Sequence, residues 1–239
     1  MEAANLDRRS FLKGGALAAA SLALAPSLFA CATPEQTEPV PENEGAPARE
    51  SATPQPNAEA APAAGSGVLV AFFSRAGENY TSAGIVPTEV GNTSIMAGFV
   101  QEALGCDVFE ITAADPYPYD YDEQLDRAQA ELDADARPAI AGELPDLSAY
   151  DTVLVGSGIW WGRPPMIMRT FLEAVDTAGK TVVPFTTHGG SGLGSASSDY
   201  QALCPDAALA DGLAVSGERV SDSREDVLAW LRDLGLLEG

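Results

Sequence analysis

The chain has 239 residues, and 35 Asp and Glu against 13 Lys and Arg give it a formal net charge of −22. Binding of DNA or RNA requires clustered Lys and Arg that displace counterions, and no basic run occurs after residue 13. We therefore expect no nucleic-acid partner and favour a partner with a basic surface.

The first 31 residues have the form of an export signal. Residues 7–13, DRRSFLK, match a twin-arginine signal, and residues 14–29 form an apolar segment too short to span a membrane comfortably. The segment ends in Leu28-Phe29-Ala30-Cys31, which resembles a bacterial lipobox with Cys31 as the lipidated residue. The alternative, an uncleaved anchor helix, is disfavoured by Pro26 inside the segment. We expect export by the twin-arginine route and a lipid anchor on the outer side of the cytoplasmic membrane.

Residues 32–66 differ sharply in composition from the rest of the chain. They contain seven prolines, nine alanines and six glutamates, with almost no large apolar side chain. Such a segment buries too little apolar surface to offset the entropy lost on ordering. We predict that it is a disordered tether, which holds a domain of residues 67–239 at some distance from the membrane.

Strands and helices alternate along residues 67–239. Residues 68–73 are six apolar residues without polar alternation, which is typical of a strand buried on both faces. The five predicted strands are residues 68–73, 107–111, 152–155, 181–186 and 212–215. The five predicted helices are residues 93–104, 121–136, a segment from Pro164-Pro165 to Val175, residues 196–203 and a segment from Asp222 to Leu234. This alternation predicts an α/β domain with right-handed crossovers and a parallel sheet.

Three local features accompany these elements. Residues 80–91, rich in Gly, Thr and Pro, are interpreted as an inserted loop before the first helix. Asn92 or Thr93 is placed to cap that helix. Residues 222–225, Asp-Ser-Arg-Glu, resemble a capping box that opens the last helix.

Three turns rich in Gly and polar or aromatic residues follow the first, third and fourth predicted strands. They are FSRAGENY at residues 73–80, IWWG at residues 159–162 and THGGSG at residues 187–192. Ligands of open α/β sheets bind beyond the carboxyl ends of the strands, and Ser and Gly turns there can bind an anion. With these turns the chain, from about residue 68 to its end, resembles bacterial flavodoxin-type proteins of the flavodoxin-like family.

The resemblance implies a three-layer sandwich with a five-stranded parallel sheet of order 2-1-3-4-5. It also implies bound flavin mononucleotide (FMN), with the first turn on the phosphate and the other two turns on the isoalloxazine ring. The implied cofactor-binding residues are Ser74, Arg75, Ala76, Gly77, Asn79, Ile159, Trp160, Trp161, Gly162, Thr187, His188, Gly189, Gly190, Ser191 and Gly192.

The first turn departs from the family pattern. Ala76 and Asn79 stand where flavodoxins usually carry threonines, so the turn lacks two hydroxyl donors. We predict a split phosphate site, in which Asn92 and Thr93 at the start of the first helix complete the turn. The alternative is that both residues are only helix caps.

Other candidate residues keep two interpretations. Trp160 and Trp161 belong either to the core or to the ring site, but adjacent residues cannot both point into one core from a strand. His188 either transfers protons or merely donates a hydrogen bond within its loop. Apart from Cys31, the chain has only Cys106 and Cys204, too few for a metal site, and we expect buried thiols or a disulfide.

These features lead to a functional hypothesis. The chain is expected to be a tethered FMN-binding electron-transfer protein or flavin oxidoreductase, which exchanges electrons with a redox partner protein or a small electron acceptor. The alternative is a degenerate flavodoxin fold that binds a different ligand or a protein. A hydrolase that uses Ser191 and His188 is disfavoured, because neither Ser157 nor Ser191 lies in a Gly-x-Ser-x-Gly turn.

Overall fold

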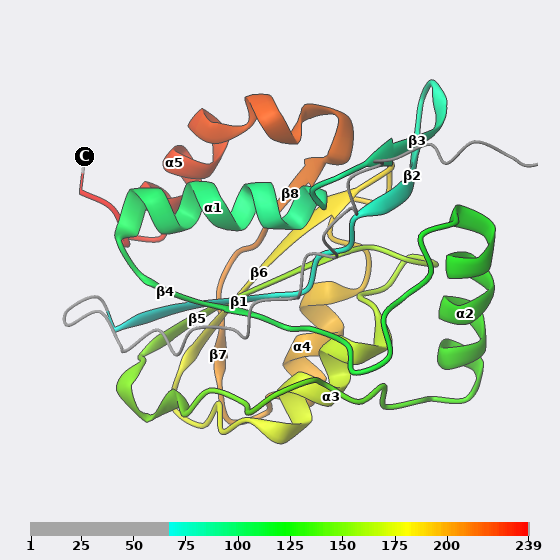
Figure 1. The fold of residues 1–239 in the computed structure, drawn as a ribbon. Helices are drawn as coiled ribbons and strands as arrows, with labels where there is room; N and C mark the ends of the chain where they lie inside the picture. The colour runs from blue at the N-terminus through cyan, green and yellow to red at the C-terminus, as the bar shows by residue number, and fades with distance from the viewer. Residues whose placement is uncertain (1–66, 239) are drawn as a thin grey trace, which may run out of the picture. The chain divides into compact units, whose positions relative to one another are not determined.

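The computed structural model describes residues 67–238 (Figure 1). The predicted signal, the tether and Cys31 lie outside the described residues. The strands are β1 (Val68–Phe72), β2 (Gly77–Thr81), β3 (Gly84–Thr88), β4 (Asp107–Glu110), β5 (Thr152–Gly158), β6 (Thr181–His188), β7 (Ala208–Leu209) and β8 (Leu213–Ser216). The helices are α1 (Asn92–Leu104), α2 (Tyr121–Asp133), η1 (Leu147–Ala149), α3 (Met166–Ala174), α4 (Ala196–Leu203), η2 (Gly217–Asp222) and α5 (Arg224–Asp233), where η marks a 3-10 helix. Within this part of the chain no helix is both long and apolar enough to cross a bilayer.

The main sheet is parallel and runs β4-β1-β5-β6, followed by β7 and β8, which both pair with β6. Numbered along the chain, the five positions have the order 2-1-3-4-5, so the predicted topology is confirmed. The fifth position is shared: β7 pairs with the start of β6 at Thr181, and β8 pairs with its end, from Phe185 to His188. All five residues of β1 are buried, as the run of apolar residues predicts.

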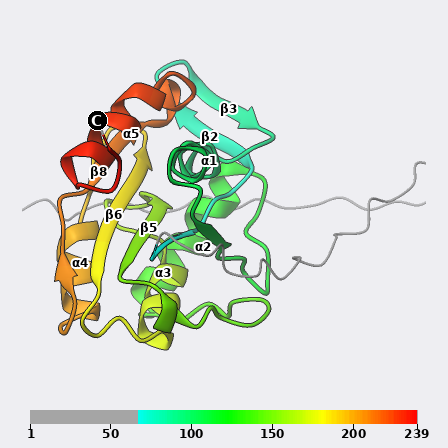
Figure 2. The same cartoon turned by 90° about the vertical axis from the view of Figure 1, so that its left-hand side faces the viewer.

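Helices cover both faces of this sheet, as Figures 1 and 2 show. Leu69 and Ala71 of β1 pack with α3 and α4, whereas Val68 and Val70 pack with α1 and α5. This alternation follows from the two-residue period of a strand and produces the three predicted layers. Cys106 and Cys204 are buried free thiols that belong to opposite layers, so the sheet separates them and they do not form a disulfide.

The prediction of a loop at residues 80–91 is wrong. Strands β2 and β3 pair antiparallel, with Gly77 opposite Thr88, and form a hairpin between the first turn and α1. Asn79 stabilises its base, because its Nδ2 donates to the Gly77 carbonyl at 2.9 Å and to Thr88 Oγ1 at 2.8 Å. β-Branched residues such as Ile85 and Val86 favour extended structure despite the Gly and Pro around them.

Both predicted caps are also wrong. Asn92 and Thr93 lie inside α1, whose N-cap is Gly91, and the Ser94 N–H donates to Ser74 Oγ at 3.0 Å. The Ser74 side chain, from the turn after β1, therefore caps one N–H group at the start of α1. At α5 the N-cap is Ser223, whose hydroxyl donates to the Val220 carbonyl instead of accepting from the helix.

Candidate binding site at the carboxyl ends of the strands

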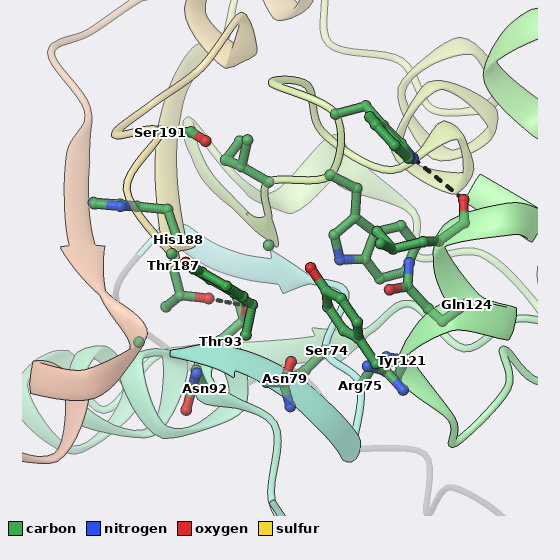
Figure 3. Close-up of a pocket in the computed structure, with 18 of the residues that line it drawn as sticks. Ser74, Arg75, Asn79, Asn92, Thr93, Tyr121, Gln124, Thr187, His188 and Ser191 are labelled. Atoms are coloured by element: carbon green, nitrogen blue, oxygen red, sulfur yellow. Dashed lines mark hydrogen bonds between the residues drawn. The ribbon is translucent and has the colours of Figure 1, made fainter. Parts of the chain in front are cut away.

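A cavity of about 400 Å³ opens where β1, β5 and β6 end and where α1 and α2 begin (Figure 3). Its volume falls within the range of about 300–1,000 Å³ that is usual for sites binding small molecules. The predicted residues that line it are Ser74, Arg75, Asn79, Asn92, Thr93, Ile159, Trp160, Trp161, Gly162, Thr187, His188, Gly189 and Ser191. The predicted residues that do not line it are Ala76, Gly77, Gly190 and Gly192.

One end of the cavity is formed by hydroxyl groups and by the start of α1. Thr93 Oγ1 and Thr187 Oγ1 share a buried hydrogen bond of 2.9 Å, which joins α1 to the end of β6. Ser74 Oγ reaches the same helix end through the Ser94 N–H. The first N–H groups of a helix lack partners within it, and the helix dipole favours negative charge there. This end of the cavity has the donors that an anion requires.

Arg75 lines the cavity, but its guanidinium is committed elsewhere. It donates to the carbonyl of Pro118 at 2.7 Å, to that of Tyr119 at 3.0 Å and to that of Glu78. Burial lowers the pKa of Arg75 from its ordinary value, against the opposing effect of Glu78. Arg75 thus joins the turn after β1 to the segment that precedes α2.

The two adjacent tryptophans diverge. The ring centroid of Trp160 lies 5.6 Å from that of Phe73 and 5.0 Å from that of Tyr117, in edge-on contacts with the core. Trp161 is 53% exposed, has a φ of 53°, and its Nε1 donates to the Leu125 carbonyl at 3.2 Å. Trp160 therefore belongs to the edge of the core, and Trp161 is the one whose ring remains accessible.

His188 forms a hydrogen bond within its own loop, because its Nδ1 accepts from the Gly190 N–H at 2.9 Å. Burial lowers the pKa of His188 below its usual value, which favours the neutral ring. A neutral ring that accepts at Nδ1 carries its proton on Nε2. The ring thus forms a hydrogen bond within its loop, but as the acceptor and not as the donor that the sequence suggested.

Several lining residues were missed by sequence reasoning: Phe73, Tyr80, Tyr121, Gln124, Leu125, Gly158 and Gly217. Tyr80 lay in the segment interpreted as a loop, and Tyr121 and Leu125 lay in the helix predicted at residues 121–136. Gln124 carries no sequence signal, since a Gln in an acidic helix is usually solvated. The hairpin places Tyr80 in the cavity wall, with its ring against Gly189. A Cβ added at Gly189 would lie only 3.2 Å from that ring.

Comparisons with known proteins agree with this architecture. The flavodoxin family model matches residues 67–234, and a model of the twin-arginine translocation pathway signal sequence matches residues 5–25. The second match supports export by the twin-arginine route. No curated protein shows significant similarity to the chain.

Two solved structures are similar over the described domain. A proposed flavoprotein from Bacteroides uniformis is 32% identical, with 69% of this chain and 97% of that chain covered and a TM-score of 0.56. A second, from Bacteroides eggerthii, is 30% identical, with 70% and 97% covered and a TM-score of 0.57. The match over residues 67–234, together with these relatives and the observed strand order, shows that the chain belongs to the flavodoxin family.

Proposed function

We propose that the chain binds FMN and transfers electrons to a partner protein or a small acceptor outside the cytoplasmic membrane. The observation that carries the proposal is that a single cavity has two chemically different ends. Hydroxyls and a helix N-terminus form one end, and Tyr121 lies away from them at the start of α2, whose Leu125 carbonyl accepts from Trp161 Nε1 in the same cavity wall. A phosphate joined to a planar ring system matches this division.

The anion end fits a phosphate held by neutral donors. Ser74 Oγ, Thr93 Oγ1 and the first N–H groups of α1 would bind it, with Asn92 beside them. Each hydrogen bond to a charged group contributes about 1.5–3 kcal/mol, so several such donors replace a cation. Arg75 is not needed as a direct ligand, because it holds the turn in place.

The aromatic end fits a planar ring. Trp161 presents an accessible face, and stacking on an aromatic ring contributes about 0.5–1.5 kcal/mol beyond the burial of area. Gly189 and Ser191 border the same space, and their backbone N–H groups would face the polar edge of a ring. A bound flavin would supply the electron-transfer chemistry, while these residues orient it and limit its contact with water.

Replacement of Thr93 by alanine tests the split phosphate site. Thr93→Ala should weaken FMN binding about tenfold, which corresponds to the loss of one hydrogen bond to a charged group. Binding of riboflavin, which lacks the phosphate, should change far less. The matched control is Thr93→Ser, which keeps the hydroxyl and should bind FMN nearly as the natural chain does.

Both ligands are measured by quenching of flavin fluorescence. Equal weakening of both ligands, or of neither, would show that the phosphate is bound elsewhere. If the natural chain is colourless when purified and does not bind added FMN, the alternative is favoured. In that case the flavodoxin fold binds a different ligand or a protein.

The anchor is a separate part of the proposal and rests on the lipobox-like sequence that ends in Cys31. Acyl chains contribute about 0.8 kcal/mol per buried CH₂, so their loss should release the protein. We expect Cys31→Ala to move the exported protein from the membrane fraction to the soluble fraction, whereas Thr33→Ala should leave it with membranes. A Cys31→Ala protein that pellets with membranes after removal of its signal would contradict lipidation at this residue.

A further inference from the structure

Gln124, at the edge of the cavity, has a buried amide nitrogen without a hydrogen-bond partner in the described part of the chain. It lies in the first turn of α2, its side chain is 1% exposed, and it lines the cavity (Figure 3). Its Nε2 has no hydrogen-bond partner within the described residues. Buried polar groups are nearly always paired, because an unpaired one loses its bonds to water without replacement. The side chain therefore has an unused donor at a site built to receive a ligand.

The other unpartnered groups do not point to a ligand. Within residues 67–238 the buried side-chain atoms without a partner belong to Arg75, Gln124, Ser157, Thr170 and Tyr200. Only Arg75 and Gln124 line the cavity. The guanidinium of Arg75 already donates to three carbonyls, so little of its donor capacity remains. Gln124 is the group in the cavity wall whose hydrogen bonding is least satisfied.

Helix α2 is fixed on both sides of Gln124. At its start, the Tyr121 N–H donates to Glu78 Oε2 at 3.1 Å, and Arg75 binds the two carbonyls that precede the helix. One residue after Gln124, the Leu125 carbonyl accepts from Trp161 Nε1 at 3.2 Å. These contacts tie α2 to the hairpin and to the turn after β5. Gln124 cannot readily turn out to solvent, and such preorganisation strengthens binding because less freedom is lost.

The surroundings of Gln124 define what it can bind. The rings that line the same cavity are those of Phe73, Tyr80, Tyr121, Trp160 and Trp161. Aromatic walls select a planar ring, and an amide offers both a donor and an acceptor in one plane. The matching partner is the edge of a planar ring that carries a carbonyl.

We propose that Gln124 binds the carbonyl-bearing edge of a planar ring in this cavity. The inference rests on the proposed function, in that the ring is either the isoalloxazine of the flavin or a planar carbonyl compound bound beside it as electron acceptor. Gln124 is then a ligand contact contributed by α2, outside the three turns that the sequence singled out.

Replacement by methionine tests the contact, because Met has a similar length but no amide. If the ring is that of the flavin, Gln124→Met should raise the Kd of riboflavin and of FMN equally, by about tenfold. This differs from Thr93→Ala, which should affect FMN alone. The matched control is Gln129→Met on the same helix, where Gln129 binds the neighbouring Asp133 and does not line the cavity.

Thermal unfolding without ligand separates a ligand contact from a structural role. Removal of an unpartnered buried amide should leave the unfolding midpoint of the ligand-free protein unchanged or higher. A second titration, of the FMN-loaded protein with 1,4-naphthoquinone, identifies the ring. A tenfold rise in the naphthoquinone Kd with unchanged flavin binding would assign Gln124 to the acceptor.

Two results would overturn the inference. One is that Gln124→Met changes neither the Kd of the flavins nor that of naphthoquinone. The other is that Gln124→Met lowers the unfolding midpoint of the ligand-free protein while Gln129→Met does not. A natural chain that binds no flavin removes the proposed function itself, and the inference with it. If the natural chain binds flavin and the Gln124→Met protein has the same affinities in both titrations, only the inference is overturned and the proposed function stands.

Discussion

Gly91→Ala is expected to weaken FMN binding about a hundredfold, the equivalent of two hydrogen bonds to a charged group. A Cβ added at Gly91 would lie 2.2 Å from Ser74 Oγ, 2.7 Å from the Arg75 carbonyl oxygen and 2.8 Å from the Arg75 nitrogen. Backbone atoms cannot move aside as the end of a flexible side chain can. The turn after β1 must therefore separate from the start of α1, and these segments are the two halves of the proposed phosphate site.

The matched control lies in α1, the helix that Gly91 caps. A Cβ at Gly98 would meet open space, and replacement of a helical Gly by Ala stabilises a protein by roughly 0.5–1 kcal/mol. Gly98→Ala should bind FMN as the natural chain does and unfold at a slightly higher temperature. Fluorescence titration with FMN and thermal unfolding check both variants. If Gly91→Ala retains the affinity of the natural chain, the two segments do not have to touch for binding.

Gly156→Ala is expected to destabilise the fold by about 3 kcal/mol, at the upper end of the usual cost of overpacking a core. Gly156 of β5 lies beside Phe185 of β6 in the register of the sheet, and an added Cβ would lie 2.0 Å from Phe185 Cζ. Phe185 has no exposed surface and its ring packs near Trp230, with centroids 6.3 Å apart, so it has little room to move. The absence of a side chain at residue 156 is what allows this ring to lie across the sheet.

Chemical denaturation measures this cost, and Gly158→Ala in the same strand is the control. The nearest atom to a Cβ at Gly158 is Trp160 Nε1 at 3.5 Å, an ordinary contact, so that variant should be close to neutral. Adding Phe185→Leu to Gly156→Ala should recover part of the lost stability, because the smaller side chain leaves room for the new Cβ. The effects of substitutions at residues in contact are not additive. A single Gly156→Ala variant as stable as the natural chain would contradict the packing described for Phe185.

The layer architecture could be predicted because it depends on local patterns. The apolar run at residues 68–73 predicts β1, and the alternation of strands and helices predicts a parallel sheet. Helix α4 was predicted at residues 196–203, where the structure has it. The carboxyl ends of parallel strands lie at one edge of a sheet, which is why the residues of three distant turns line one cavity. The sequence by itself thus determined the layers, the sheet order through the family resemblance, and the edge at which to look for a site.

The tertiary structure decided which way individual side chains point. Arg75 looks like an anion ligand in the sequence, but it binds carbonyls at residues 118 and 119, more than 40 positions away. Gln124 looks like a solvated residue in the sequence. It lines the cavity because hydrogen bonds join α2 to the hairpin and to Trp161. Periodicity reports only on neighbours a few residues apart, whereas these roles arise from hydrogen bonds between segments that meet when the chain folds. Which donor pairs with which acceptor then depends on proximity in space. A local pattern of residues does not encode that proximity.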